Sequence, residues 1–177
     1  MNTVLLVVIV LVVVAVIAAL AFVYVRRRRR ENVRQEFGPE YERVVQERGS
    51  EREAERELRE RREEVESRIR PLSDESRKHH EKEWEGVEKT FVDDPVLALD
   101  QADRVVADIL AERNFPTETR EEAAAAVGVT HSDVVEDFRD AQRTHADATR
   151  SGESGDLEEM RRAIQKYRSV YERLIEG

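Results

Sequence analysis

Cysteine is absent from the 177-residue chain, which excludes thiol nucleophiles and thiolate metal sites. Glycine is scarce, with seven residues, and the chain has neither a Gly-x-x-x-x-Gly-Lys-Ser/Thr nor a Gly-x-Gly-x-x-Gly run, the loops that hold phosphates. Aromatic residues form only 6% of the chain and prolines number four, whereas Asp, Glu, Lys and Arg form 39%. This composition favours helices joined by ion pairs over β-sheet, so we predict an all-α protein.

Histidine is also rare, and the four histidines do not form a site by their spacing. His79 and Glu83 stand four residues apart and could share a metal on one helix face, but a competent site needs three or four ligands. His80 and His145 fall on apolar helix faces, where simple packing is the commoner role. We therefore predict no catalytic, cofactor-binding or metal-binding residue and a protein that is not an enzyme.

Charge of the two signs is distributed unevenly along the chain. Residues 1–30 carry a net charge of +5, residues 31–70 carry −3, and residues 71–177 carry −11, which gives −9 in all. Binding to nucleic acid needs a basic face, so the acidic body excludes nucleic acid as an expected partner.

A long apolar run stands at the start of the chain. Val4–Val25 is a stretch of 22 residues without charge, in which the Tyr24 hydroxyl is the only polar group. As a helix it would be about 33 Å long, against about 30 Å for the hydrocarbon core of a bilayer. We predict a transmembrane helix over residues 3–25, which makes the lipid bilayer the first partner.

The alternative interpretation of this run is a cleaved signal peptide, since Ala19-Leu20-Ala21 has the small-x-small pattern of a cleavage site. Met1-Asn2-Thr3 carries no basic side chain, and the apolar run exceeds the usual 7–15 residues of a signal peptide. An uncleaved anchor is therefore favoured, and a secreted helical protein remains the alternative.

Five consecutive arginines follow the apolar run and predict its orientation. Positive charge close to a membrane span stays on the cytoplasmic side, and each cation near the anionic leaflet contributes about 1 kcal/mol. We predict a single-pass plasma-membrane protein whose N-terminus faces out and whose C-terminal domain is cytoplasmic. The residues assigned to the membrane boundary are Arg26, Arg27, Arg28, Arg29 and Arg30.

Residues 26–70 are predicted to form a basic collar and a charged helical stalk. Gly38-Pro39 interrupts the first helical stretch, and Ser50 with Glu53 forms a capping box for a helix that runs to Ile69. The apolar stripe of this helix is sparse, so a solvated stalk is favoured over one strand of a coiled coil. The expected i,i+4 ion pairs are Glu55–Arg59, Glu57–Arg61, Glu64–Arg68 and Glu66–Arg70.

Residues 71–177 are predicted to form an acidic cytoplasmic bundle of four or five helices. The periodicity predicts helices over about 74–92, 95–113, 119–127, 132–149 and 156–174. The expected N-caps are Ser73, Asp94 and Thr119, and Gly128 is expected in the left-handed position that closes the third of these helices.

The last predicted helix carries an unbroken heptad seam. We predict first that this seam packs into the protein's own core. The alternative is that it binds a partner helix or a second copy of the chain. The residues of this candidate partner seam are Leu157, Met160, Ile164, Tyr167, Tyr171 and Leu174.

The whole layout resembles a group of uncharacterised single-pass membrane proteins of high-GC bacteria, for which no activity is known. Arginine outnumbers lysine 26 to 4, which suits GC-rich coding. The resemblance implies a fold and a location, not an activity. The segments that carry it are Arg26 to Arg30, Phe37-Gly38-Pro39-Glu40-Tyr41, Arg70-Pro71-Leu72-Ser73, Trp84 and Phe91-Val92-Asp93-Asp94-Pro95.

Three functions are consistent with an anchor and helices that lack catalytic residues. The first is a membrane-anchored interaction or scaffolding protein that recruits a cytoplasmic partner. The second is a structural stalk that resembles the b subunit of rotary ATP synthases, although several prolines and glycines cut what should be one long helix. The third is an accessory or regulatory subunit of an enzyme.

Overall fold

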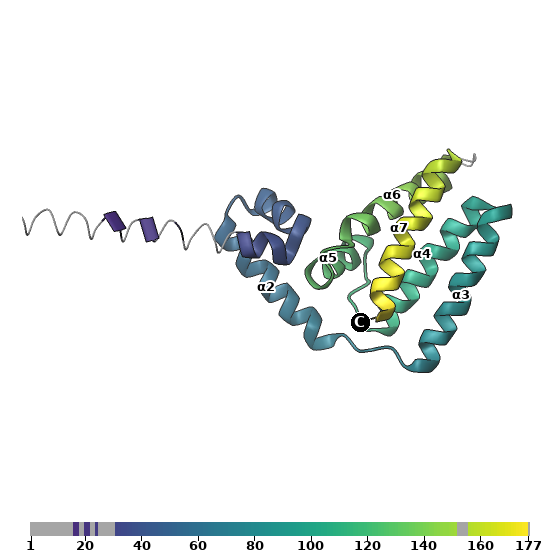
Figure 1. Ribbon diagram of the computed structural model, residues 1–177, viewed down its shortest axis with the longest axis horizontal. Helices are drawn as coiled ribbons and strands as arrows, with labels where there is room; N and C mark the ends of the chain where they lie inside the picture. The colour runs from purple at the N-terminus through teal and green to yellow at the C-terminus, as the bar shows by residue number, and fades with distance from the viewer. Residues whose placement is uncertain (1–15, 18–19, 22–23, 25–30, 152–155, 177) are drawn as a thin grey trace, which may run out of the picture. The chain divides into compact units, whose positions relative to one another are not determined.

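The computed structural model describes residues 16–17, 20–21, 24, 31–151 and 156–176 (Figure 1). The chain divides into two compact units, Met1–Glu36 and Phe37–Gly177. All regular secondary structure in the described residues is helical, as the composition predicts. The sequence predicted a boundary at residue 70, whereas the structure places residues 37–70 in the same unit as the bundle.

Within the residues that the structure describes, six helices follow a first helical stretch over residues 31–48. Gly38 within that stretch has a φ of +51°, so regular right-handed helix is interrupted at the predicted place. Gly49, at φ +67°, ends it. The later helices are α2 (Glu51–Arg68), α3 (Asp74–Asp93), α4 (Pro95–Glu112), α5 (Arg120–Thr130), α6 (Val135–Ser151) and α7 (Leu157–Glu176).

Side-chain caps start three of these helices where the sequence predicted them. The side-chain oxygens of Ser73, Asp94 and Thr119 each accept a hydrogen bond from the backbone N–H three residues on, at 3.0, 3.0 and 3.1 Å. Ser50 stands at the predicted N-cap of α2, but its side chain makes no capping hydrogen bond, so the predicted capping box there is wrong.

Helix α4 is the centre of the bundle, because it packs against α3, α6 and α7, and α6 packs against α7 (Figure 1). Its buried residues form a wide apolar face, so it can be covered on several sides. Trp84 of α3 stacks on Tyr171 of α7, with ring centroids 4.6 Å apart. The buried side chains of α4 are Ala98, Leu99, Ala102, Val105, Val106, Ile109 and Leu110.

Helix α2 packs against α5 instead of standing free as a stalk. The sparse stripe read from the sequence is the contact face, since Ala54, Leu58 and Val65 are buried. The extended linker after α2 is tied to the end of α4, where the Arg70 N–H donates to the Arg113 carbonyl at 2.9 Å. The helix packs although a free stalk was predicted, because a narrow apolar stripe is enough for close packing when the opposing helix has small side chains, as alanine-rich α5 does.

The predicted span over residues 3–25 and the arginines at 26–30 lie outside the described residues, apart from 16–17, 20–21 and 24. Across the part of the chain that the structure describes, no helix has both the length and the apolar character of a membrane span.

Candidate functional site

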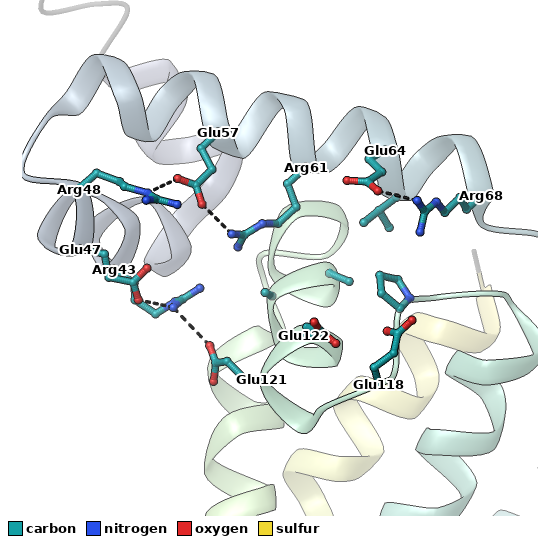
Figure 2. Close-up of a pocket in the computed structure, with 14 residues that line it drawn as sticks. Arg43, Glu47, Arg48, Glu57, Arg61, Glu64, Arg68, Glu118, Glu121 and Glu122 are labelled. Atoms are coloured by element: carbon teal, nitrogen blue, oxygen red, sulfur yellow. Dashed lines mark hydrogen bonds and ion pairs between the residues drawn. The ribbon is translucent and has the colours of Figure 1, made fainter.

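A cleft of about 490 Å³ lies where α2 passes over α5, and we call it the α2–α5 cleft (Figure 2). Its walls come from the end of the first helical stretch, from α2, and from the first turns of α5 with the loop that precedes it, which together we call the α5 wall. Ten of its side chains are charged. The lining residues are Arg43, Glu47, Arg48, Glu57, Arg61, Glu64, Val65, Arg68, Pro116, Glu118, Glu121, Glu122, Ala125 and Ala126.

The α2 wall is a line of alternating charges. Steps of four and three residues place Glu57, Arg61, Glu64 and Arg68 on one helix face. Glu57 accepts from Arg61 Nη2 at 2.8 Å and from Arg48 Nε at 2.5 Å, and Glu64 accepts from Arg68 Nη2 at 2.6 Å. The hydrogen bond from Arg48 lowers the pKa of the Glu57 carboxyl, which stays ionised at neutral pH. The cleft's arginines on this wall are therefore already occupied by glutamates.

The α5 wall is acidic and has fewer partners. Glu121 lies 3.3 Å from Arg43 Nη1, across the cleft. Glu118 and Glu122 are exposed, and no ion pair to either carboxylate is found within the described part of the chain. Figure 2 shows Glu118, Glu121 and Glu122 on the side of the cleft that faces α2. The α5 wall thus carries the carboxylates that remain available to a ligand.

Behind the cleft, Glu40 is fully buried and is neutralised by arginines from three helical segments. Its carboxylate lies 2.5 Å from Arg43 Nη2, 2.7 Å from Arg139 Nη2 and 3.6 Å from Arg61 Nη1. Since a buried charge is tolerated only when it is paired and hydrogen-bonded, this cluster holds the 37–48 segment against α2 and α6. The hydrogen bond that Arg43 donates to Glu40 raises the pKa of Arg43.

Gly128 gives Glu40 the room that it needs. The sequence predicted Gly128 as the left-handed residue that ends a helix, but α5 continues through it to Thr130, and that prediction is wrong. A Cβ at residue 128 would lie 3.1 Å from Glu40 Oε2 and 3.2 Å from Val135 Cγ2. The glycine is therefore required by the close approach of a carboxylate, not by the backbone angle.

We expect Gly128→Ala to lower the free energy of unfolding by about 1 kcal/mol, although alanine is favoured over glycine by about that amount in a helix interior. The arginines hold Glu40 in place, so the contact cannot relax freely. Urea unfolding of the full chain in detergent, followed by circular dichroism, measures the change. In a Glu40→Ala background the same substitution should cost less, and an equal cost in both backgrounds would contradict this explanation.

Two buried histidines connect α4 to its neighbours. The His80 ring nitrogens lie 2.8 Å from Glu83 Oε2 and 3.0 Å from Glu112 Oε2, and the latter contact joins α3 to α4. His145 of α6 lies 3.5 Å from Asp103 Oδ2 of α4. These imidazoles are enclosed between carboxylates of the bundle and do not line the α2–α5 cleft.

Asp103 brings four helices together. It accepts from the Tyr167 hydroxyl of α7 at 2.8 Å and from Arg120 Nη2 of α5 at 2.7 Å, and it faces His145 of α6. Burial raises the pKa of the Tyr167 hydroxyl, and the neighbouring Asp103 charge raises it further. This tyrosine therefore acts as a neutral hydrogen-bond donor that ties α7 to α4.

His131, at the end of α5, makes the stability depend on pH. Burial, and next the charge of Arg113, lower its pKa to about 4. The unfolded chain binds a proton near pH 6.5 and the folded chain does not, so this contribution is complete above pH 6.5 and is lost as the pH falls towards 4.

Between about pH 7.5 and about pH 5 we expect the contribution of His131 to the free energy of unfolding to fall by about 1 kcal/mol. This is less than the full pKa shift implies, because the ring is partly exposed to solvent. Urea unfolding of the full chain at the two pH values measures it. His131→Gln should remove that part of the pH dependence, whereas His79→Gln, at an exposed position, should leave it unchanged. Equal slopes for the wild type and the His131 variant would refute the assignment.

The residues that the sequence singled out form two sets, the arginines at the membrane boundary and the seam of the last helix. Arg26 to Arg30 lie outside the described residues. In the seam of α7, Met160, Tyr167, Tyr171 and Leu174 are buried in the bundle, which is the first of the two uses predicted for it. Ile164 is half-buried and Leu157 is exposed, so the buried four are not free for a partner helix in this conformation.

Sequence reasoning missed the Glu40 cluster and the α2–α5 cleft. Glu40 stands in a run dense with glutamates, and its partner Arg139 lies 99 residues further along. The one available signal was its place in the Phe37-Gly38-Pro39-Glu40-Tyr41 segment, where Phe37 and Tyr41 are also buried. For metals, no set of three or more His, Cys, Asp or Glu side chains suited to an ion occurs in the described parts of the chain.

Comparisons of the chain with protein-family models, with curated proteins and with solved structures found no match.

Proposed function

We propose that the protein is a non-enzymatic scaffold, anchored in the plasma membrane by a single span, whose cytoplasmic helical body recruits a protein partner. The observation that carries the proposal is the uncharged run Val4–Val25 followed directly by five arginines. Within that run, residues 16, 17, 20, 21 and 24 are helical and exposed. Apolar helical side chains such as Ile17, at 60% exposure, are unfavourable in water and favourable in lipid.

The body supports recruitment better than catalysis. Its enclosed titratable groups, such as the buried His80 and His145 and the half-buried Asp103, join neighbouring helices to one another, which is a structural use. Its open cleft is lined by charged side chains at the surface, and complementary charge on a partner macromolecule would give specificity there.

The stalk alternative is less well supported. A peripheral stalk needs one long helix, whereas α3 to α7 pack back on one another within a single unit. This packing favours a folded body as the cytoplasmic part of the proposed scaffold.

The anchor is tested with a fluorescent reporter, active only in the cytoplasm, fused to the C-terminus of the full chain. We expect fluorescence and recovery of the intact chain in the membrane pellet after a carbonate wash. Replacing the five arginines at 26–30 by glutamine should mix the orientations, because the positive charges set them. An exported reporter, or a chain cleaved after Ala21, would overturn the proposal.

Recruitment is tested by crosslinking in native membranes, followed by purification of the full chain and mass spectrometry. The matched control is residues 1–36 fused to an inert soluble domain, which keeps the same anchor. We expect at least one protein enriched with the full chain and not with the control. Equal recovery of all proteins in the two samples would sink the scaffold role while leaving the anchor intact.

A further inference from the structure

We propose that the α2–α5 cleft binds a basic segment of the partner protein, with a lysine or arginine side chain of that segment placed against Glu118 and Glu122. The inference rests on the proposed scaffold function and specifies the chemistry of its partner. It is carried by the balance of charge in the cleft, by its apolar base and by its openness to solvent.

The charge of the cleft favours a cation. Six glutamates and four arginines line it, so it carries a net charge of −2. Each arginine already pairs with a glutamate at 2.5–2.8 Å, as in Arg48–Glu57 and Arg68–Glu64. Arg61 Nη1 is buried and has no hydrogen-bond partner in the described structure, but it faces the Glu40 carboxylate at 3.6 Å. An anionic ligand at the other arginine nitrogens would have to displace the paired glutamates and would face the remaining carboxylates. A cation meets two carboxylates that have no ion pair among the described residues.

The apolar base of the cleft suits the stem of a long basic side chain. Val65 and Ala126 are almost fully buried beneath the charged wall, and Ala125 and Pro116 stand beside them. Lysine and arginine lay their methylene groups along such surfaces while the charged end stays among polar groups. The volume of about 490 Å³ lies within the range of ligand sites, which is about 300–1,000 Å³.

Openness favours a protein segment over a small free cation. The side chains of Glu47, Glu64 and Glu121 at the cleft are 50%, 60% and 66% exposed, so one side of any occupant remains in solvent. A small-molecule site commonly encloses about 70–90% of its ligand. A side chain that projects from a larger partner needs to be covered on one side only, because the partner covers the other.

The test is a fluorescence-polarisation titration of the full chain in detergent micelles at about 50 mM salt. The probe is a labelled peptide of alternating glycine and lysine, and the comparison ligands are a glycine–glutamate peptide and free spermidine. We expect saturable binding of the basic peptide and none of the acidic peptide. The double variant Glu118→Gln/Glu122→Gln should raise the Kd about fivefold, as the loss of two exposed charge contacts implies.

The matched control is Glu81→Gln/Glu85→Gln, which removes the same charge from exposed positions on α3. An equal loss of affinity in both double variants would show general attraction to an acidic protein and overturn the cleft assignment. Competition by spermidine at concentrations below those of the peptide would assign a small cation instead, which also overturns it. If crosslinking finds a partner whose recovery is unchanged in the Glu118/Glu122 variant, the scaffold function stands and this inference fails.

Discussion

Replacing Glu40 by alanine should lower the free energy of unfolding by about 3 to 5 kcal/mol, the largest effect of any single substitution proposed for this chain. The carboxylate is fully buried and neutralises Arg43 and Arg139 at 2.5 and 2.7 Å. Its loss leaves two guanidinium groups without their central partner at the junction of the 37–48 segment, α2 and α6. Urea unfolding of the full chain in detergent, followed by circular dichroism, measures the change.

Glu40→Gln separates charge from shape, since glutamine has nearly the same volume but cannot neutralise the arginines. We expect a smaller loss, of about 1 to 3 kcal/mol. Glu60→Ala is the control. Glu60 lies on α2 at 70% exposure, and its ion pair with Arg56 is long, at 3.8 Å, so its loss should cost less than about 0.5 kcal/mol. A Glu40→Ala variant as stable as the Glu60 control would show that the buried cluster does not hold the segment in place.

The second large effect is expected at Arg113, at the C-terminal end of α4. Its side chain is 2% exposed and donates from Nη1 to the Leu174 carbonyl at 2.8 Å and from Nε to the Arg70 carbonyl at 3.3 Å. Its guanidinium also lies 5.4 Å from the Phe115 ring centroid. The carbonyls at the end of α7 favour a cation, while burial lowers the pKa of Arg113.

Arg113→Ala should therefore cost about 3 kcal/mol, because it leaves two carbonyls without a donor and opens a cavity among three chain segments. The fluorescence of Trp84, the only tryptophan, reports the transition, since this ring stacks on Tyr171 near the end of α7. Arg104→Ala is the control on the same helix, as Arg104 is 70% exposed and pairs with Asp100 one turn away. Equal unfolding midpoints for the two variants would show that Arg113 does not stabilise the junction of α4, α7 and the linker after α2.

Arg113 does not line the α2–α5 cleft, whereas Glu40 contacts two of its arginines, so the two substitutions should affect the cleft differently. Glu40→Ala should disturb the cleft as well, because Arg43 and Arg61 contact both Glu40 and the cleft glutamates. Arg113→Ala should lower stability while leaving binding of a basic peptide to the folded chain unchanged.

Local signals in the sequence determined much of the helical architecture. Ser73, Asp94 and Thr119 mark helix starts because a capping side chain bonds to a backbone N–H only three residues away. The pairs Glu55–Arg59 and Glu64–Arg68 formed as predicted, because i,i+4 neighbours share a helix face in any tertiary setting. The predicted pair Glu66–Arg70 did not form, and Glu66 pairs with Arg62 instead, because Arg70 lies beyond the end of α2.

Only the tertiary structure decided which of many similar charged residues matter. Apart from its apolar neighbours Phe37 and Tyr41, nothing near Glu40 in the sequence distinguishes it from the exposed glutamates around it. Its burial arises from Arg139 of α6 and the missing side chain of Gly128. Arg113 reaches Leu174 across 61 residues. Periodicity reports one helix at a time, whereas burial and ion pairing between helices depend on which faces meet, and that is set by the packing of the whole unit.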